Sequence, residues 1–169
     1  MIIGNGTIAS VIPDREDFIF FASGVANSQE LDEKKYQREI DLLLSQDMTK
    51  HLVYFGSLSI FQKSSRYTEH KIYMEQLVRK NFPSYTIMRL GNPTWGTNVQ
   101  HLIPFIKEKI KNKEAFEVLD EYRYVLEKEE FVYWIGLIPS WNSEMMITGI
   151  RLKVEEIVKK YGHPKIPTK

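Results

Sequence analysis

The chain has 169 residues, a formal net charge of +1 and no cysteine. This composition excludes disulfides and thiolate metal sites, and the balanced charge argues against a nucleic-acid or anionic-membrane partner. The four histidines show no ligand spacing, so no metal site is expected. Because there is neither a long apolar run nor a basic, apolar leader, we expect a cytoplasmic protein with one domain over residues 1–162 and a C-terminal tail over 163–169.

Short apolar runs alternate with amphipathic segments from the start of the chain. Continuous apolar runs with turn residues at their ends predict buried strands over 18–23, 51–57 and 85–92. Apolar residues at helical spacing predict helices over 29–46 and 66–82. The inward face of the first helix would consist of Tyr36, Ile40, Leu43 and Leu44.

The same alternation continues in the C-terminal half. Helices are predicted over 101–113, 129–138 and 152–162, and a strand over 144–149. Two short strand-like runs flank a turn, at 115–120 and 122–127. Strands that alternate with helices are typical of a three-layer α/β fold, a parallel sheet with helices on both faces.

Residues 4–9, Gly-Asn-Gly-Thr-Ile-Ala, fit the turn pattern G-x-G-x-x-A directly after an apolar start. Such a turn lets the backbone approach a pyrophosphate and points a helix N-terminus at the anion. The match alone is weak, because a glycine turn without a ligand explains it equally well. A dinucleotide site also needs an acidic residue about 20 residues later for the ribose, and strand 18–23 is followed by Ala-Ser-Gly instead.

A tyrosine four residues before a lysine occurs three times, in YTEHK (67–71), YVLEK (124–128) and YGHPK (161–165). Since both residue types are common in this chain, the spacing alone proves nothing. The last pair is separated by a glycine and a proline, so no helix presents both side chains. The middle pair lies in a strand-like run, which holds such residues about 13 Å apart. Only Tyr67 and Lys71 project from one face of a predicted helix.

Ser57 lies at the end of the strand that precedes this helix. Because the carboxyl ends of parallel strands border the ligand crevice, we expect Ser57, Tyr67 and Lys71 to converge there. A free tyrosine has a pKa near 10, and a neighbouring ammonium would stabilise its phenolate for general-base work. Ser57 would bind a substrate hydroxyl or carbonyl, and Lys71 a ribose hydroxyl. The alternative is an exposed helix face with an incidental tyrosine and lysine.

These motifs, in this order, resemble the short-chain dehydrogenase/reductase superfamily, in its extended NAD-dependent epimerase/dehydratase branch. The resemblance covers roughly residues 1–162. The matching stretches are IIGNGTIA, FIFFASG, LVYFGSLSIF, SRYTEHKIYMEQLV, TIMRLGNPTWG, YRYVLEKEEFV and ITGIRLKVEEIV. The resemblance implies a Rossmann-like fold and a reaction on a sugar or nucleotide-sugar.

The resemblance also implies a role for each matching position. The implied catalytic residues are Ser57, Tyr67 and Lys71, and the implied substrate contacts are Ser57 and Asn92. The implied NAD or NADP contacts are Gly4, Asn5, Gly6, Ile8, Ala22, Ser23, Gly24 and Lys71. In such relatives the helices that match 29–46 and 66–82 form a homodimer surface.

The chain departs from the family pattern between the glycine turn and strand 18–23. Residues 10–17 are too few for the two strands and the helices that the family places there. The expected fold is therefore truncated in its adenosine-binding half, with a first strand that is very short or covered by an oligomer contact. The interval from Ser57 to Tyr67 is also short, and Gly56 stands where a second serine is common.

Three functions stay open. The first is an NAD(P)-dependent oxidoreductase, epimerase or dehydratase with Ser57, Tyr67 and Lys71 as its catalytic core. The second is a non-catalytic relative, a binding or assembly protein with cofactor binding lost, which the missing half favours. The third is a flavodoxin-like or nucleotide-binding α/β protein with accidental motifs.

Overall fold

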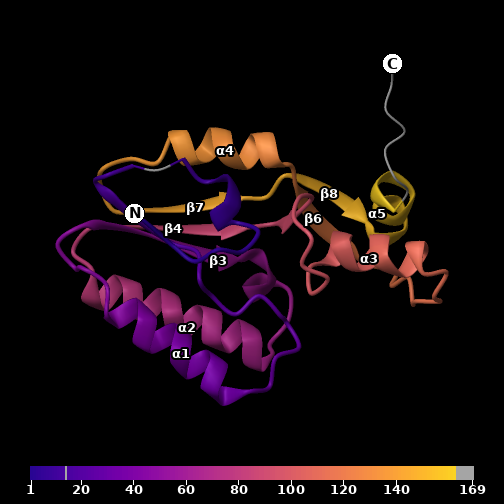
Figure 1. Ribbon diagram of the computed structural model, residues 1–169, viewed down its shortest axis with the longest axis horizontal. Helices are drawn as coiled ribbons and strands as arrows, with labels where there is room; N and C mark the ends of the chain where they lie inside the picture. Colours follow the sequence, from indigo (N-terminus) through magenta and orange to yellow (C-terminus); the bar gives the residue numbers. More distant parts are fainter. Residues whose placement is uncertain (14, 163–169) are drawn as a thin grey trace.

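The computed structural model describes residues 1–13 and 15–162. Its main sheet has five parallel strands in the order β1-β2-β3-β4-β7, of which β3, β4 and β7 are labelled in Figure 1. These strands are Ile2–Ile3 (β1), Phe18–Phe21 (β2), His51–Ser57 (β3), Tyr85–Leu90 (β4) and Ser143–Ile147 (β7). The three central strands are buried along nearly their whole length, as their continuous apolar runs predict. The predicted tail over 163–169 lies outside the described residues.

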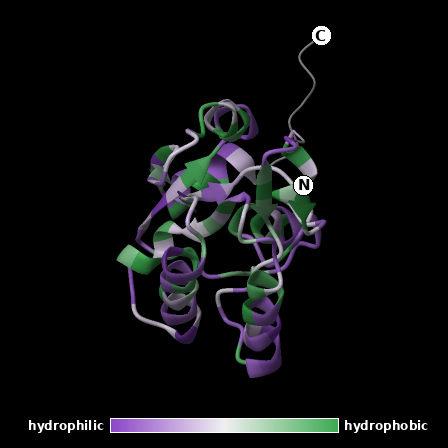
Figure 2. Cartoon of the chain, turned by 90° about the vertical axis from the view of Figure 1, so that its left-hand side faces the viewer, coloured by the Kyte–Doolittle hydropathy of each residue, from purple (hydrophilic) through white to green (hydrophobic). Residues whose placement is uncertain are grey.

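Helices cover both faces of this sheet (Figure 1). The helices α1 (Glu33–Leu44) and α2 (Arg66–Asn81) pack on one face, and hydrophilic stretches dominate these two lower helices in Figure 2. The other face carries α4 (Lys128–Gly136) and the short 3-10 turn η1 (Ala9–Val11). The predicted three-layer, Rossmann-like α/β fold is confirmed. Within the described part of the chain, no helix is long and apolar enough to cross a membrane.

The connection from β1 to β2 explains the shortened sheet. The two strands pair directly and in parallel, with Ile2 opposite Phe20. The linking residues 4–17 are barely sufficient for a parallel crossover, and the only regular structure among those described is η1. Among the described residues, β1 is the outer strand and has only two residues. The predicted truncation and the very short first strand are both confirmed.

A second, smaller sheet lies beyond the carboxyl end of β4 (Figure 1). Its strands, in spatial order, are Asn92–Pro93 (β5), Tyr122–Leu126 (β6) and Ile150–Lys153 (β8). The helices packed on it are α3 (Leu102–Lys111) and α5 (Val154–Tyr161). Its apolar core joins α3, α5, β6 and β8.

Two predictions for the C-terminal half are wrong. The predicted helix over 152–162 begins only at Val154, because Leu152 and Lys153 pair with β6 as part of antiparallel β8. Residues 115–120, predicted as a strand-like run, form no strand. In that run only Phe116 is partly buried, where its ring packs edge-on against Phe105 of α3.

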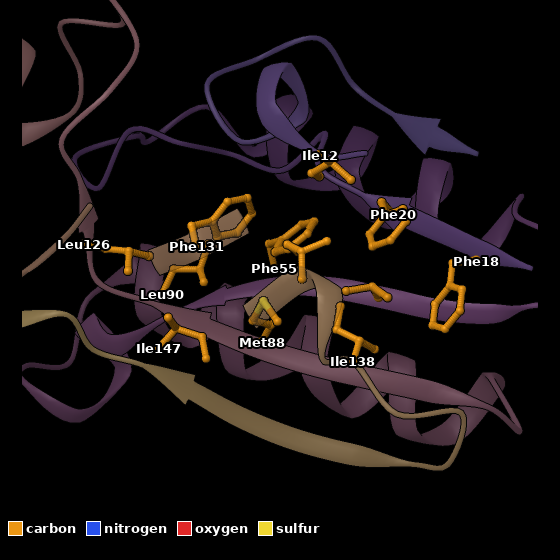
Figure 3. Close-up of a cluster of buried hydrophobic side chains, with 12 residues drawn as sticks. Ile12, Phe18, Phe20, Phe55, Met88, Leu90, Leu126, Phe131, Ile138 and Ile147 are labelled. Carbon is orange, nitrogen blue, oxygen red and sulfur yellow. The ribbon is translucent and has the colours of Figure 1, made fainter. Parts of the chain in front are cut away.

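The core on the α4 side fixes the segment that follows β4. Figure 3 shows Phe55 and Leu90 of the sheet pointing toward Phe131 of α4. The Phe131 ring is fully buried, with its centre 5.8 Å from that of Phe55 and 5.3 Å from that of Trp95. Trp95, which follows β5, is thereby held over the carboxyl end of the main sheet.

Gly149 connects β7 to β8 and gives a test of this architecture. It has a φ of 64°, and a Cβ there would lie 2.0 Å from the Val125 carbonyl oxygen. Gly149→Ala should lower the free energy of unfolding by about 2 kcal/mol or more, because left-handed strain adds to a backbone clash. Urea unfolding followed by circular dichroism measures this change. Gly136→Ala is the matched control, since nothing lies within 4 Å of its added Cβ; equal losses in both variants would contradict the packing described.

Candidate functional site

Lys71 lies inside the protein, on the side of α2 that packs against α1. Its ammonium donates hydrogen bonds to Glu39 Oε1 at 2.9 Å and to Tyr54 Oη at 3.2 Å. The exposed fractions are 3% for Lys71 and 0% for Glu39. Lys71 is therefore one half of a buried ion pair and does not open onto solvent.

Glu39 of α1 is the centre of this cluster. Its Oε2 accepts hydrogen bonds from the Val25 backbone N–H at 2.7 Å and from His70 Nε2 at 3.1 Å. Its Oε1 accepts a further bond from the Tyr54 hydroxyl at 3.1 Å, besides the bond from Lys71. One carboxylate thus joins α1, α2, β3 and the turn after β2.

The sequence interpretation missed Glu39, although its position carried a signal. It lies three residues after Tyr36 and four before Leu43, and all three side chains are buried on one helix face. Leu44, predicted for this face, is instead 37% exposed. A carboxylate within an apolar helix face indicates a buried partner, because an unpaired charge there is costly.

The surroundings fix the protonation states of the cluster. Burial raises the pKa of Glu39, but the Lys71 charge and hydrogen bonds from His70, Val25 and Lys71 outweigh burial and lower this pKa to about 2. Burial also lowers the pKa of Lys71, yet the Glu39 charge raises it overall above its usual value. Burial holds the pKa of Tyr54 well above 10. Glu39 and Lys71 are therefore both charged at neutral pH, and Tyr54 is neutral.

Tyr67 and Ser57 have different environments. The Lys71 Nζ atom lies 5.7 Å from the centre of the Tyr67 ring, as a shared helix face predicts. The Tyr67 phenol forms no hydrogen bond with another described residue. Every fully buried polar side-chain atom of the described residues has a hydrogen-bond partner. The phenol oxygen of Tyr67 is therefore in part exposed to solvent. Ser57 caps the 3-10 turn η2 (Leu58–Phe61), with its Oγ 2.7 Å from that of Ser59.

The predicted cofactor turn at residues 4–9 is engaged by the protein itself. Gly4 has a φ of 119°, and a Cβ there would lie 2.5 Å from the Ala22 carbonyl oxygen, so backbone packing already explains this glycine. The Thr7 carbonyl accepts a hydrogen bond from Trp95 Nε1 at 2.8 Å. Asn5 and Gly6 are exposed. Ile8 packs against the core on the α4 side.

The turn after β2 lies directly on the buried ion pair. A Cβ at Gly24 would lie 2.7 Å from Lys71 Nζ and 2.8 Å from Glu39 Oε1. Ser23 is bound by Arg38, which donates to its carbonyl at 3.3 Å and to its hydroxyl at 3.0 Å. The Ala22 N–H donates to the Ile3 carbonyl at 2.8 Å, and this bond fixes the turn to β1.

Two further positions have structural partners. Asn92 donates from Nδ2 to the Tyr124 carbonyl at 2.9 Å and so ties β5 to β6.

A Cβ at Gly56 would lie 3.0 Å from Glu75 Oε1. Glu75 forms a paired ion contact with Arg89, at 2.8 and 2.6 Å. A serine at position 56 would crowd this contact, which accounts for the glycine.

The described residues do not fit a complete NAD or NADP molecule. The turn η1 is only three residues long and gives a pyrophosphate no helix N-terminus of useful length. No described strand lies outside β1 to hold the adenosine end. Lys71, the implied ribose contact, is bound to Glu39 beneath Gly24. The described part of the chain also contains no group of three or more His, Cys, Asp and Glu side chains placed to hold a metal ion.

An open pocket of about 610 Å³ lies beyond the carboxyl ends of β3 and β7. Its walls include Phe61, Tyr122, Arg123, Tyr124, Met146 and Arg151. The Arg151 guanidinium lies 3.9 Å from the centre of the Tyr122 ring, and Arg123 pairs with Glu121, which also lines the pocket. Two guanidinium groups against one carboxylate leave the lining with a positive charge. A second pocket, of about 210 Å³ beside Gly24, is much smaller.

Comparison with known proteins supports the fold. No protein-family model and no curated sequence matches the chain. Among solved structures, the Bordetella bronchiseptica enzyme WbmG in complex with NAD aligns over 90% of this chain and 58% of its own, with a TM-score of 0.62 and 15% identity. WbmH of the same organism, in complex with NAD+, aligns over 90% and 60%, with a TM-score of 0.66 and 13% identity.

The UDP-glucose 4-epimerase of Thermus thermophilus, in complex with NAD, aligns over 85% of this chain and 60% of its own. Its TM-score is 0.58 and its identity 12%. The chain therefore has the fold of these enzymes, which were crystallised with NAD. It spans only about three-fifths of their length, in agreement with the predicted shortening.

The pKa of Glu39 predicts how stability depends on pH. Its value falls from 4.5 in an unfolded chain to about 2 in the folded protein. Between these values the unfolded state binds more protons, so stability should fall as the pH is lowered from about 4.5 to about 2. Denaturant unfolding across this range measures the slope. Glu39→Gln should show a shallower acid slope, and an unchanged slope would contradict the assignment.

Proposed function

We propose that the protein binds a nucleotide sugar in the pocket of about 610 Å³. The observation that carries the proposal is the cationic and aromatic lining of this pocket, in a chain whose connection between β1 and β2 is short. The carboxyl ends of parallel strands are where open α/β sheets bind ligands. The pocket volume also lies within the roughly 300–1,000 Å³ of small-molecule sites.

The lining matches the chemistry of such a ligand. Arg123 and Arg151 supply guanidinium groups, which bind phosphate oxygens through paired hydrogen bonds. Tyr122, 43% exposed, offers a ring to a base or sugar. Ser57 precedes the lining residue Leu58, and Asn92 donates a hydrogen bond to the lining residue Tyr124. Both are proposed as contacts for the sugar end, although neither lines the pocket itself. Solved structures of the same fold contain UDP together with NAD, as in WbmG, and UDP-glucose, as in the Thermotoga maritima UDP-glucose 4-epimerase.

A second candidate is an NAD(P)-dependent oxidoreductase, epimerase or dehydratase with Ser57, Tyr67 and Lys71 as its catalytic residues. The observation that favours it is the Tyr67–Lys71 arrangement, with 5.7 Å between the ammonium and the ring centre and a phenol that forms no hydrogen bond with another described residue. This candidate requires Lys71 to leave Glu39 and a dinucleotide to bind without an outer strand beside β1. Binding of a nucleotide sugar in the pocket requires neither of these changes, so it is the function that the geometry supports best.

A homodimer through α1 and α2 is a further proposal. The outer sides of these helices carry Leu44, Ile72 and Tyr73, with exposed fractions of 37%, 40% and 46%. Burial of these side chains between two copies would remove them from water. Analytical ultracentrifugation of the protein and of an Ile72→Glu variant tests this contact.

Calorimetric titration with UDP and UDP-glucose tests the proposed function. Arg151→Ala should weaken binding by about tenfold, because a charged hydrogen bond to phosphate is lost. Lys107→Ala, on an exposed part of α3, is the control and should leave the affinity unchanged. If neither ligand binds the unmodified protein at millimolar concentration, the proposal fails.

Titration with NAD+, NADH, NADP+ and NADPH separates the two candidates. The binding function predicts that none of the four binds at millimolar concentration. Binding that Lys71→Ala weakens would favour the NAD(P)-dependent enzyme, because it would place Lys71 on the dinucleotide.

A further inference from the structure

Glu39 and Lys71 lie outside the lining of the larger pocket and under the turn that follows β2. We propose that this pair is an internal lock, in which the Glu39 carboxylate takes the place of a bound ligand on Lys71. The lock joins α1, α2 and residues 22–25, and it keeps the Lys71 amine from binding a ligand or taking part in catalysis. It does not depend on nucleotide-sugar binding and stands if that proposal fails.

The buried charge of Glu39 is satisfied by hydrogen bonds from within the protein. Four donors converge on the two oxygens of Glu39, from Lys71, Tyr54, His70 and the Val25 N–H, at distances between 2.7 and 3.1 Å. A carboxylate has about four acceptor positions, so this one has no need of an outside partner. Because the side chains are buried, bulk solvent does not weaken these contacts by screening.

A ligand hydroxyl would have to displace Glu39 from Lys71. The carboxylate is charged and lies 2.9 Å from the ammonium, whereas a ribose hydroxyl is neutral and forms a weaker hydrogen bond. The exchange would also leave the Glu39 charge buried without its main counter-ion, which is strongly unfavourable. On the side of Gly24 the amine is covered closely, since a methyl group on that glycine would lie 2.7 Å from Lys71 Nζ. The contact between Lys71 and Glu39 is therefore more favourable than a contact between Lys71 and a ribose hydroxyl.

This lock gives the Tyr67–Lys71 spacing a structural meaning. Lys71 must lie on the inward face of α2 to reach Glu39, and Tyr67 lies one helical turn earlier on the same face. Tyr67 is 9% exposed and packs beside the lysine. The pair thus contributes to the contact of α2 with α1, with Lys71 as a structural residue.

A double-mutant cycle tests the lock. Glu39→Gln and Lys71→Met should each lower the melting temperature by roughly 10 °C, because each leaves an unpaired charge in the interior. The double variant should melt well above the value that the two separate losses add up to. Additive losses, or a Lys71→Met protein as stable as the unmodified one, would overturn the proposal.

The exposed pair Glu155–Lys159 supplies the matched control. Its side chains are 64% and 72% exposed, and its atoms approach to 2.5 Å. The corresponding Glu155→Gln and Lys159→Met cycle should show no measurable coupling. If a single variant of the lock fails to fold while the double variant folds, the result supports the lock.

Amine labelling of the unmodified protein decides the matter if every variant of the cycle fails to fold. Brief treatment with acetic anhydride, followed by peptide mass spectrometry, compares Lys71 with the exposed Lys107. Lys71 should react at least about 100-fold more slowly, because its amine becomes accessible only on local unfolding. Acetylation of Lys71 at the rate of Lys107 in the folded protein would overturn the lock.

Discussion

The structure depends on the buried contact between Glu39 and Lys71. Two charges without access to water are tolerated only when each satisfies the other and the remaining donors are matched, and the cluster meets this condition. The requirement fixes the distance between α1 and α2, the approach of Gly24 and the neutral state of Tyr54. A single carboxylate thereby joins α1, α2, β3 and the turn after β2.

The carboxyl side of the sheet has two different parts. Near β1 and β2, the glycine turn packs on Ala22 and accepts a hydrogen bond from Trp95, while Asn5 and Gly6 are exposed. Near β3 and β7, the small sheet stands away from η2 and leaves a pocket with two arginines. The chain thus keeps the fold of the compared structures, with an open pocket beyond β3 and β7 and a shortened connection between β1 and β2.

Much of this architecture could be predicted because it depends on local patterns. Continuous apolar runs predicted β2, β3 and β4. The truncation was predicted because residues 10–17 are too few for the elements that the resembled family places there. The main error on the small sheet has a physical cause. The pairing of β8 with β6 connects residues far apart in the sequence, and Leu152 and Lys153 fit the spacing of the helix that follows them.

The candidate site was predictable only in part, for a similar reason. The helix spacing placed Tyr67 and Lys71 on one face correctly, but the partner of Lys71 is 32 residues earlier, on another helix. No local pattern specifies such a contact, although the charge of Glu39 within an apolar face was a usable signal. The assigned roles of Ser57, Tyr67 and Asn92 stay predictions.

A crystal structure of the protein grown with NAD+ and UDP-glucose, each at millimolar concentration, tests the central claim most directly. The account predicts UDP-glucose beside Arg123 and Arg151, no dinucleotide, and Lys71 Nζ within hydrogen-bond distance of Glu39. A dinucleotide whose ribose hydroxyls bind Lys71, with Glu39 displaced from the ammonium, would contradict it.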